Sequence, residues 1–134
     1  MITSNPLIIK DSTLEDLENN AWHEPTFTSN AVISCHNLRK IPLKNLTIDN
    51  LRLLITQKIG LPYIVSIAID FLEDNPWCGE LYRGDLLLAV LQVDKDFWRE
   101  NQALYHRLSE IMCIIENDME LAEKQLLPNW KLLL

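Results

Sequence analysis

The stretch that decides the fold lies in the middle of the chain and reads TIDNLRLLITQKIGLPYIVSIAIDFLEDNP (residues 47–76). Thr47 is a good N-cap residue, Asp49 follows in the first turn, and apolar residues then recur at helical spacing. Gly60 adopts a positive φ at little cost and ends this helix, while Pro62 suits the first turn of the next one. The pattern predicts two consecutive helices that meet at Gly60.

The second of these helices has the clearest amphipathic pattern in the sequence. Its apolar residues fall at i, i+3, i+4, i+7, i+8 and i+11, and they are Leu61, Ile64, Val65, Ala68, Ile69 and Leu72. Three carboxylates, Asp70, Glu73 and Asp74, lie largely elsewhere around the helix, and Asn75-Pro76 ends it. This pattern is typical of a helix with one face in a core and one face in water.

Helical signals continue upstream of this central pair. A short helix begins after Ser12, which we expect to act as the N-cap, and closes at Asn19-Asn20. A second helix covers residues 31–40 and places Arg39 and Lys40 in its last turn, where the helix dipole favours cations.

Helical signals also continue downstream. Gly84-Asp85 opens a helix through six apolar residues, 86–91, with Asp85 as a favourable charge at the positive helix end. A central strand is the alternative for this run, but its Leu and Ala content favours a helix that is buried nearly all round. One long helical segment follows, capped by residues 94–96. No alternating run is long enough for a sheet, so we expect an all-α, single-domain bundle of about five to seven helices over residues 1–134.

The charge of the chain is uneven. The protein has 134 residues, 48% of them hydrophobic, and a net charge of −7. Residues 1–60 carry six acids and six bases, whereas residues 61–134 carry thirteen acids and six bases. Such a surface repels nucleic acids and anionic membranes and attracts a basic protein partner. A merely solubilising surface is the simpler alternative.

Sequence motifs for catalysis, cofactors and metals are absent. Three glycines cannot supply a Walker loop or a dinucleotide fingerprint, and neither HExxH nor GxSxG occurs. Cys35 and His106 could act as a nucleophile and its base only if the fold brought these distant residues together. His36 follows Cys35 directly, but neighbours on a helix point in different directions, so these two side chains do not pair readily. We therefore expect no enzyme, no cofactor and no metal. Three reduced, mostly buried cysteines, no secretory signal and no membrane-spanning run predict a cytoplasmic protein.

Four tryptophans are many for this length, and we expect most of Trp22, Trp77, Trp98 and Trp130 to anchor the core. The aromatic residues are not interleaved with bases, so a nucleic-acid platform has no support.

An ordered set of short motifs carries a family resemblance over roughly residues 10–100. The motifs are LTIDNLRLLITQKIGLPY (46–63), the helix ending in Asn75-Pro76, GELYRGDLL (79–87) and the pair Phe97-Trp98. Together they resemble the immunity proteins of bacterial contact-dependent growth inhibition (CDI) systems. Trp77-Cys78 and Arg83 depart from the family pattern without breaking its spacing.

The resemblance implies a cytoplasmic protein that binds and neutralises the cognate C-terminal toxin domain delivered by a neighbouring cell. Many such toxins are nucleases with basic clefts, so an acidic inhibitor fits as a plug. We expect the motifs to be scaffold and the contacts to fall mainly on polar residues. The predicted toxin-binding residues are Asp70, Glu73, Asp74, Trp77, Glu80, Tyr82, Asp94, Asp96, Glu116, Asp118 and Glu120.

Two other functions remain open from the sequence. One is a helical adaptor or chaperone for another basic partner, which would bind several proteins weakly. The other is a small hydrolase that uses Asp70, Glu73 and Asp74.

Overall fold

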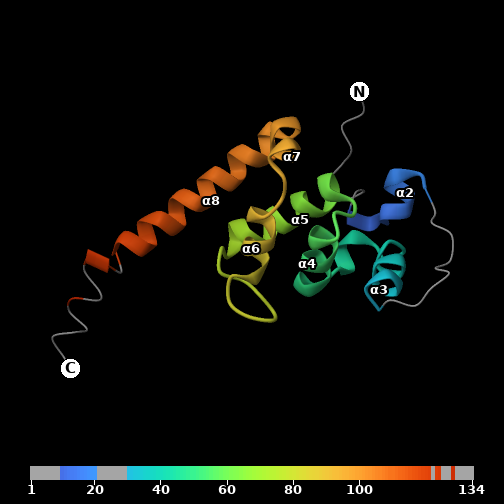
Figure 1. Ribbon diagram of the computed structural model, residues 1–134, viewed down its shortest axis with the longest axis horizontal. Helices are drawn as coiled ribbons and strands as arrows, with labels where there is room; N and C mark the ends of the chain where they lie inside the picture. The colour runs from blue at the N-terminus through green and yellow to red at the C-terminus, as the bar shows by residue number, and fades with distance from the viewer. Residues whose placement is uncertain (1–9, 21–29, 122, 125–127, 129–134) are drawn as a thin grey trace. The chain divides into compact units, whose positions relative to one another are not determined.

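The computed structural model describes residues 10–20, 30–121, 123, 124 and 128 (Figure 1). The chain divides after Asp94 into two compact units, an N-terminal unit (Met1–Asp94) and a C-terminal unit (Lys95–Leu134). The described residues form seven α-helices and one 3-10 turn and contain no strand. The all-α prediction is therefore confirmed, and the helix number is within the expected range. A single domain over residues 1–134 stays a prediction.

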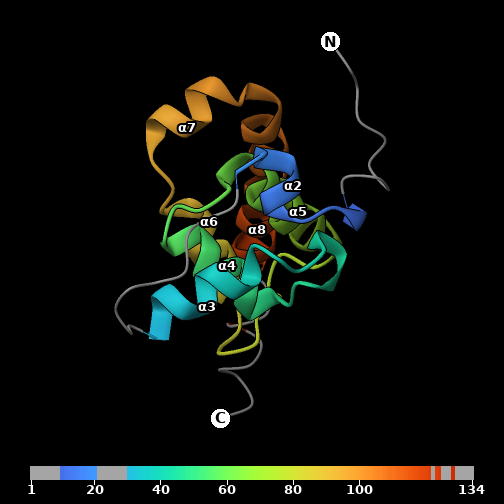
Figure 2. The same cartoon turned by 90° about the vertical axis from the view of Figure 1, so that its right-hand side faces the viewer.

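The N-terminal unit contains five of these helices. They are α2 (Leu14–Glu18), α3 (Asn30–Leu38), α4 (Ile48–Thr56), α5 (Leu61–Asp74) and α6 (Asp85–Leu91), with a 3-10 turn η1 (Leu43–Asn45) before α4. Helix α4 contacts α3, α5 and α6, and α5 also contacts α6. Figure 1 shows α4 between α3 and α6, and Figure 2 shows α3 beside α4 from the side. Helix α4 is thus the central element of this unit.

The core of the N-terminal unit comes largely from the predicted apolar residues of α4, α5 and α6, except that predicted Leu61 is half-buried and Ile67, which was not predicted, is buried. Each of its aliphatic side chains contributes roughly 1.5–3 kcal/mol through burial. The buried residues are Leu51, Leu54 and Ile55 of α4, Ile64, Val65, Ile67, Ala68, Ile69 and Leu72 of α5, and Leu86, Leu87, Ala89 and Val90 of α6. The run 86–91 is a helix as predicted, but it is not buried all round, because Leu88 and Leu91 are each 45% exposed.

The junction between α4 and α5 confirms one local prediction and corrects another. Thr47 and Asn50 form a reciprocal capping box, each side-chain oxygen accepting from the other's backbone N–H at 3.1 Å. Helix α4 ends earlier than predicted, at Thr56, and Lys58 takes a positive φ of 59°. Gly60, with φ 61°, is instead the N-cap of α5. A β-carbon there would lie 2.6 Å from Leu14 Cδ2, so packing also requires glycine.

Arg39 differs most from its prediction in the upstream helices. Helix α3 ends at Leu38, so Arg39 lies beyond the last turn, and only 1% of it is exposed. Its Nη2 donates to Glu18 Oε1 at 2.9 Å and to the Asn20 carbonyl at 2.6 Å. Arg39 therefore ties the end of α2 to the end of α3, which explains its burial. The N-cap of α2 is Thr13, whose hydroxyl accepts from Asp16 N, and not Ser12.

The described part of the C-terminal unit contains two α-helices where one was expected. Helix α7 (Lys95–Glu100) contacts α8 (Gln102–Leu121), and Asn101 separates them by donating from Nδ2 to the Phe97 carbonyl at 2.8 Å. The Phe97 and Trp98 rings pack edge to face at 5.1 Å. The sequence places Leu104, Leu108, Ile111, Ile115 and Met119 at helical spacing along α8. Of these, Leu108, Ile111 and Ile115 are buried, Leu104 is half-buried and Met119 is 52% exposed.

Tryptophan and cysteine burial is only partly as expected. Trp98 is buried and Trp77 is half-buried, while Trp22 and Trp130 lie outside the described residues. All three cysteines are free, but only Cys35 is buried; Cys78 is half-buried and Cys113 is exposed. The expectation of mostly buried thiols is therefore wrong, because Cys113 lies on the solvated side of α8.

Candidate functional site

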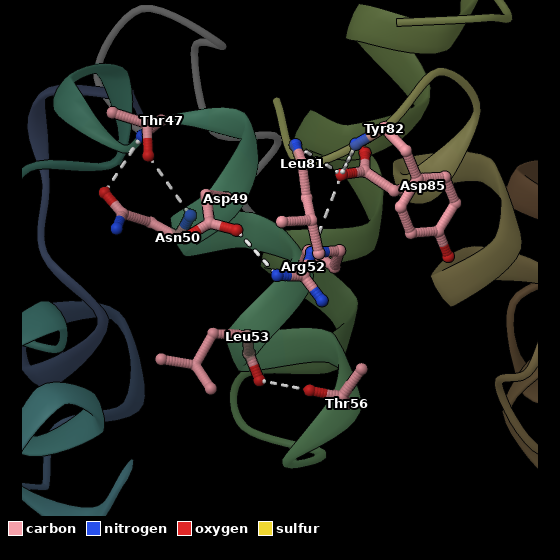
Figure 3. Close-up of polar contacts among 9 residues, drawn as sticks. All are labelled: Thr47, Asp49, Asn50, Arg52, Leu53, Thr56, Leu81, Tyr82 and Asp85. Atoms are coloured by element: carbon pink, nitrogen blue, oxygen red, sulfur yellow. Dashed lines mark hydrogen bonds and ion pairs between the residues drawn. The ribbon is translucent and has the colours of Figure 1, made fainter. Parts of the chain in front are cut away.

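The connection between α5 and α6 is built around one buried carboxylate. We call residues 75–84 the Asp85 loop, because Asp85 Oδ2 accepts from Leu81 N at 2.9 Å and from Tyr82 N at 3.3 Å (Figure 3). The side chain of Asp85 is 0% exposed. Hydrogen bonds from backbone N–H groups to a charged acceptor are stronger than those between neutral groups. One side chain thus fixes the backbone at the tip of the loop.

Arg52 of α4 supplies the positive charge that faces this carboxylate. Its Nε lies 3.8 Å from Asp85 Oδ2, while its Nη2 donates to Asp49 Oδ1 at 2.7 Å (Figure 3). The hydrogen bond to Asp49 raises the pKa of the Arg52 guanidinium above its ordinary value, with a smaller contribution from Asp85. A permanent cation therefore offsets the cost of burying the Asp85 charge.

The loop is also closed by contacts within itself. Asn75 Oδ1 accepts from Trp77 N at 3.1 Å, and the Trp77 carbonyl accepts from Gly84 N at 3.0 Å. A β-carbon at Gly79 would collide with the Tyr82 carbonyl and lie 2.5 Å from Asp85 Oδ1, so the loop passes too close to its own carboxylate for any side chain there. These contacts give the loop one defined backbone path.

The loop presents two large side chains to solvent. Leu81 is 67% exposed and Tyr82 is 52% exposed, and Glu80 and Arg83 are exposed beside them. Trp77 is half-buried beneath the Arg83 guanidinium, which lies 5.4 Å from its ring centroid. Of the two predicted aromatic anchors, Tyr82 is thus accessible and Trp77 is partly covered. Sequence reasoning missed Leu81.

The three predicted acids of α5 are exposed and share one side of the helix. Asp70, Glu73 and Asp74 are spaced at i, i+3 and i+4. Asp70 Oδ2 lies 3.8 Å from Lys10 Nζ, so this carboxylate already faces a cation. Asp70 and Asp74 border an open groove of about 310 Å³, whose other lining residues are Lys10, Leu43, Lys44, Leu46, Ile67 and Phe71.

The same region holds Cys78 in its protonated form. Burial raises the pKa of the Cys78 thiol, and the negative charges of Asp85 and Asp74 raise it further. Burial also raises the pKa of the Cys35 thiol. A thiol with a raised pKa is a poor nucleophile, because the thiolate is the reactive form. Neither cysteine therefore has the environment of a catalytic residue.

The remaining predicted residues are exposed, and all of them except Asp94 belong to the C-terminal unit. Asp94 pairs with Lys58 at 3.3 Å, Asp96 with Arg99 at 3.3 Å and Glu120 with Lys124 at 2.6 Å. Glu116 and Glu120 share a face of α8 at i and i+4, whereas Asp118 points about 160° away around the helix. The predicted set is thus divided between the two units: Asp70, Glu73, Asp74, Trp77, Glu80, Tyr82 and Asp94 belong to the N-terminal unit, and Asp96, Glu116, Asp118 and Glu120 to the C-terminal unit.

A groove in the C-terminal unit was missed from the sequence. It measures about 400 Å³ and is lined by Lys95, Trp98, Arg99, Gln102 and Tyr105. The Trp98 and Tyr105 rings lie 6.3 Å apart. The i, i+4 spacing of Lys95 and Arg99 around Trp98 was the available signal.

In the described part of the chain, no group of three or more His, Cys, Asp and Glu residues is placed to hold a metal ion. None of the helices in that part is long and apolar enough to cross a membrane.

Comparisons with known proteins place the chain in a family. Neither a curated protein nor a solved structure matches it. A family model described as CDI immunity proteins matches residues 16–108, which is well over half of the chain. The match includes α4, α5, the Asp85 loop and α6, the elements whose sequence carried the resemblance. The chain belongs to the family of CDI immunity proteins.

Proposed function

We propose that this protein acts in the cytoplasm, where it binds the cognate CDI toxin domain and blocks its active site, and that this toxin is a basic nuclease. Family membership supports the toxin-neutralising role. The net charge of −7 supports the basic partner, because opposite charges speed association and favour a complementary surface.

The observation that carries this proposal is the cluster at the Asp85 loop. The exposed acids of α5, namely Asp70, Glu73 and Asp74, directly precede a loop that carries Glu80 and exposed Tyr82. Carboxylates on a rigid support can occupy the positions that phosphates of a nucleic acid take in a basic cleft. We propose that these residues contact the toxin, rather than the other predicted acids, Asp94, Asp96, Glu116, Asp118 and Glu120.

The hydrolase alternative gains no support from the site. Asp70, Glu73 and Asp74 are all exposed, and a pair of catalytic carboxylates needs surroundings that push their pKa values apart. The adaptor alternative predicts weak binding to several proteins, whereas an immunity protein binds one toxin at nanomolar affinity or better.

Survival of a host cell tests the function directly. The toxin domain is expressed from the gene next to that of this protein, with this protein, with an unrelated immunity protein, or alone. We expect growth only in the first case. Death in all three cases, with this protein present in the soluble fraction, overturns the immunity function in favour of the adaptor.

Competition with nucleic acid tests the blocking mechanism. The toxin domain, inactivated at its catalytic residue, is titrated with labelled substrate RNA or DNA in the presence and absence of this protein. We expect the protein to displace the nucleic acid, and we expect the affinity of the protein for the toxin to fall as salt rises. A ternary complex with undiminished nucleic-acid affinity excludes active-site blocking.

A further inference from the structure

We propose that Leu81 and Tyr82, at the tip of the Asp85 loop, form the apolar anchor of the toxin interface, and that Asp85 is the residue that positions them. This inference rests on the proposed function, because the occupant it names is the basic toxin domain. It adds that most of the affinity comes from an apolar recess on the toxin and not from the acids around it.

The first argument is the exposure of these side chains. Leu81 is 67% exposed and Tyr82 is 52% exposed, and the two are adjacent in the chain. Burying such side chains in a partner removes apolar surface from water, which is the dominant favourable term in association. Tyrosine is also among the residues that most often dominate binding energy at protein interfaces.

The second argument is that the loop is already ordered before binding. Asp85 Oδ2 accepts from the backbone N–H groups of the two anchor residues themselves, at 2.9 Å and 3.3 Å (Figure 3). A flexible loop would lose conformational entropy when it binds, which weakens the affinity. This loop is already ordered in the folded protein, so binding does not carry that cost. The buried Asp85 charge and its Arg52 partner thus act on the residues we assign to the interface.

The third argument is the charge around the anchor, which selects the occupant. Glu80 precedes Leu81, and Asp74 lies close enough to the loop to raise the pKa of Cys78. Arg83 follows Tyr82 and lies over the Trp77 ring, so these two acids and one base give the rim a net negative charge. Apolar centres with charged rims are the usual arrangement of a specific interface. An acidic rim favours a basic protein and disfavours a second copy of this chain, which carries the same net charge of −7.

The anchor is tested with the double variant Leu81→Ser/Tyr82→Ala. Its affinity for the inactivated toxin domain is measured by calorimetry at low and high salt, beside the control Leu88→Ser/Leu91→Ala. The control pair is also exposed and apolar, but lies on α6 outside the loop. We expect the loop variant to bind at least 100-fold more weakly with an unchanged salt dependence, and the control to bind as the wild type does.

The outcomes separate this inference from the proposed function. Failure of the wild-type protein to bind the toxin overturns the proposed function. Wild-type binding together with equally tight binding by the loop variant overturns the anchor. Dimers of the wild-type protein that the loop variant loses would make a second copy the occupant, and would also overturn it.

The positioning role of Asp85 is tested with Asp85→Asn and Asp85→Ala by hydrogen exchange of the free protein. We expect the Leu81 and Tyr82 amides to exchange faster while the α5 amides keep their protection, and we expect toxin association to slow. Unchanged exchange at these two amides in a folded variant overturns the role. If Asp85→Ala fails to fold, Arg52→Gln, which keeps Asp85 in place, gives the same readout in milder form.

Discussion

The Asp85 loop and the exposed face of α8 both have acidic residues, but the two regions use them differently. At the loop, the carboxylate of Asp85, the first residue of α6, is fully buried, accepts two backbone N–H groups and faces Arg52. On α8, Glu116 and Glu120 are exposed, and the cation beside Glu120 is Lys124, one turn further on. A charge count treats both regions alike, whereas burial decides which carboxylate determines structure.

The largest loss of stability that this comparison predicts follows from removing the buried carboxylate of Asp85. Asp85→Ala leaves two backbone N–H groups without their charged acceptor and removes the carboxylate that faces Arg52, so we expect a loss of about 3–5 kcal/mol in the free energy of unfolding. Urea denaturation measures it. The matched control on α8, Asp118→Ala, is expected to change stability by less than about 0.5 kcal/mol. Equal effects of the two variants would contradict the comparison.

The second largest effect concerns the close approach inside the loop. Gly79→Ala places a β-carbon against the Tyr82 carbonyl and 2.5 Å from Asp85 Oδ1. Neither neighbour is the free end of a flexible side chain, so we expect a loss of about 1–3 kcal/mol, as for an overpacked core. Thermal unfolding of Gly79→Ala beside Glu80→Ala, its exposed neighbour, checks the value. A Gly79→Ala protein as stable as the wild type would mean that the loop backbone shifts to make room for the β-carbon, which would contradict the prediction.

The reactivity of the cysteine thiols is also expected to differ between the Asp85 loop and α8. Cys78 belongs to the loop and has a raised pKa, whereas Cys113 is exposed on α8. We expect a thiol reagent at pH 8 to label Cys113 at least about 10-fold faster, because the thiolate is the reactive form. Mass spectrometry of single-cysteine variants measures the rates, and equal rates would contradict the burial of Cys78.

The raised pKa of Cys78 also predicts how stability depends on pH. In the folded protein the thiol keeps its proton to higher pH than in the unfolded chain. Its contribution to stability is therefore complete below the ordinary thiol pKa of about 8.5 and is lost as the pH rises through the folded value. Cys78→Ser should flatten the decline of stability above that pH, whereas Cys113→Ser should not. A decline of the same steepness in both variants would rule out Cys78 as its source.

The smallest effect is expected from an exposed ion pair on the C-terminal unit. Glu120→Gln removes the contact with Lys124, which lies at i+4 with both side chains exposed. Such pairs contribute about 0.3–0.5 kcal/mol and are screened by salt. Denaturation at low salt should therefore show a slightly lower stability for the variant than for the wild type, and this difference should disappear at 1 M salt. A loss above about 1 kcal/mol would show that the acidic face of α8 is more than a solvated surface.

Local signals allowed most of the fold to be predicted, and tertiary contacts explain what was missed. Thr47 with its first turn, and Gly60 with Pro62, act within a few residues, so the sequence predicted α4 and α5 well. The burial of Arg39 depends on Glu18 and Asn20, about twenty residues upstream. Local sequence patterns do not reveal contacts over such a distance, so the role of Arg39 was not predicted.

The candidate site shows the same limit. Asp85 was predicted as a charge at a helix end, since it follows Gly84 at the start of an apolar run. Its actual role depends on Arg52, thirty-three positions earlier, and on a loop that folds back over it. The exposure of Leu81 follows from that loop path, so no periodicity could reveal it. Tyr82 was proposed from its aromatic type alone; its side chain is 52% exposed, and its contact with the toxin stays a prediction.

The two sets of residues in the Asp85 loop have a consequence for specificity. Asn75, Gly79, Gly84 and Asp85 determine the backbone path, while Glu80, Leu81 and Tyr82 face solvent. The outward side chains can therefore be exchanged without rebuilding the frame that holds them. Under the toxin interface proposed above, new outward residues on the same backbone would change which toxin the protein binds.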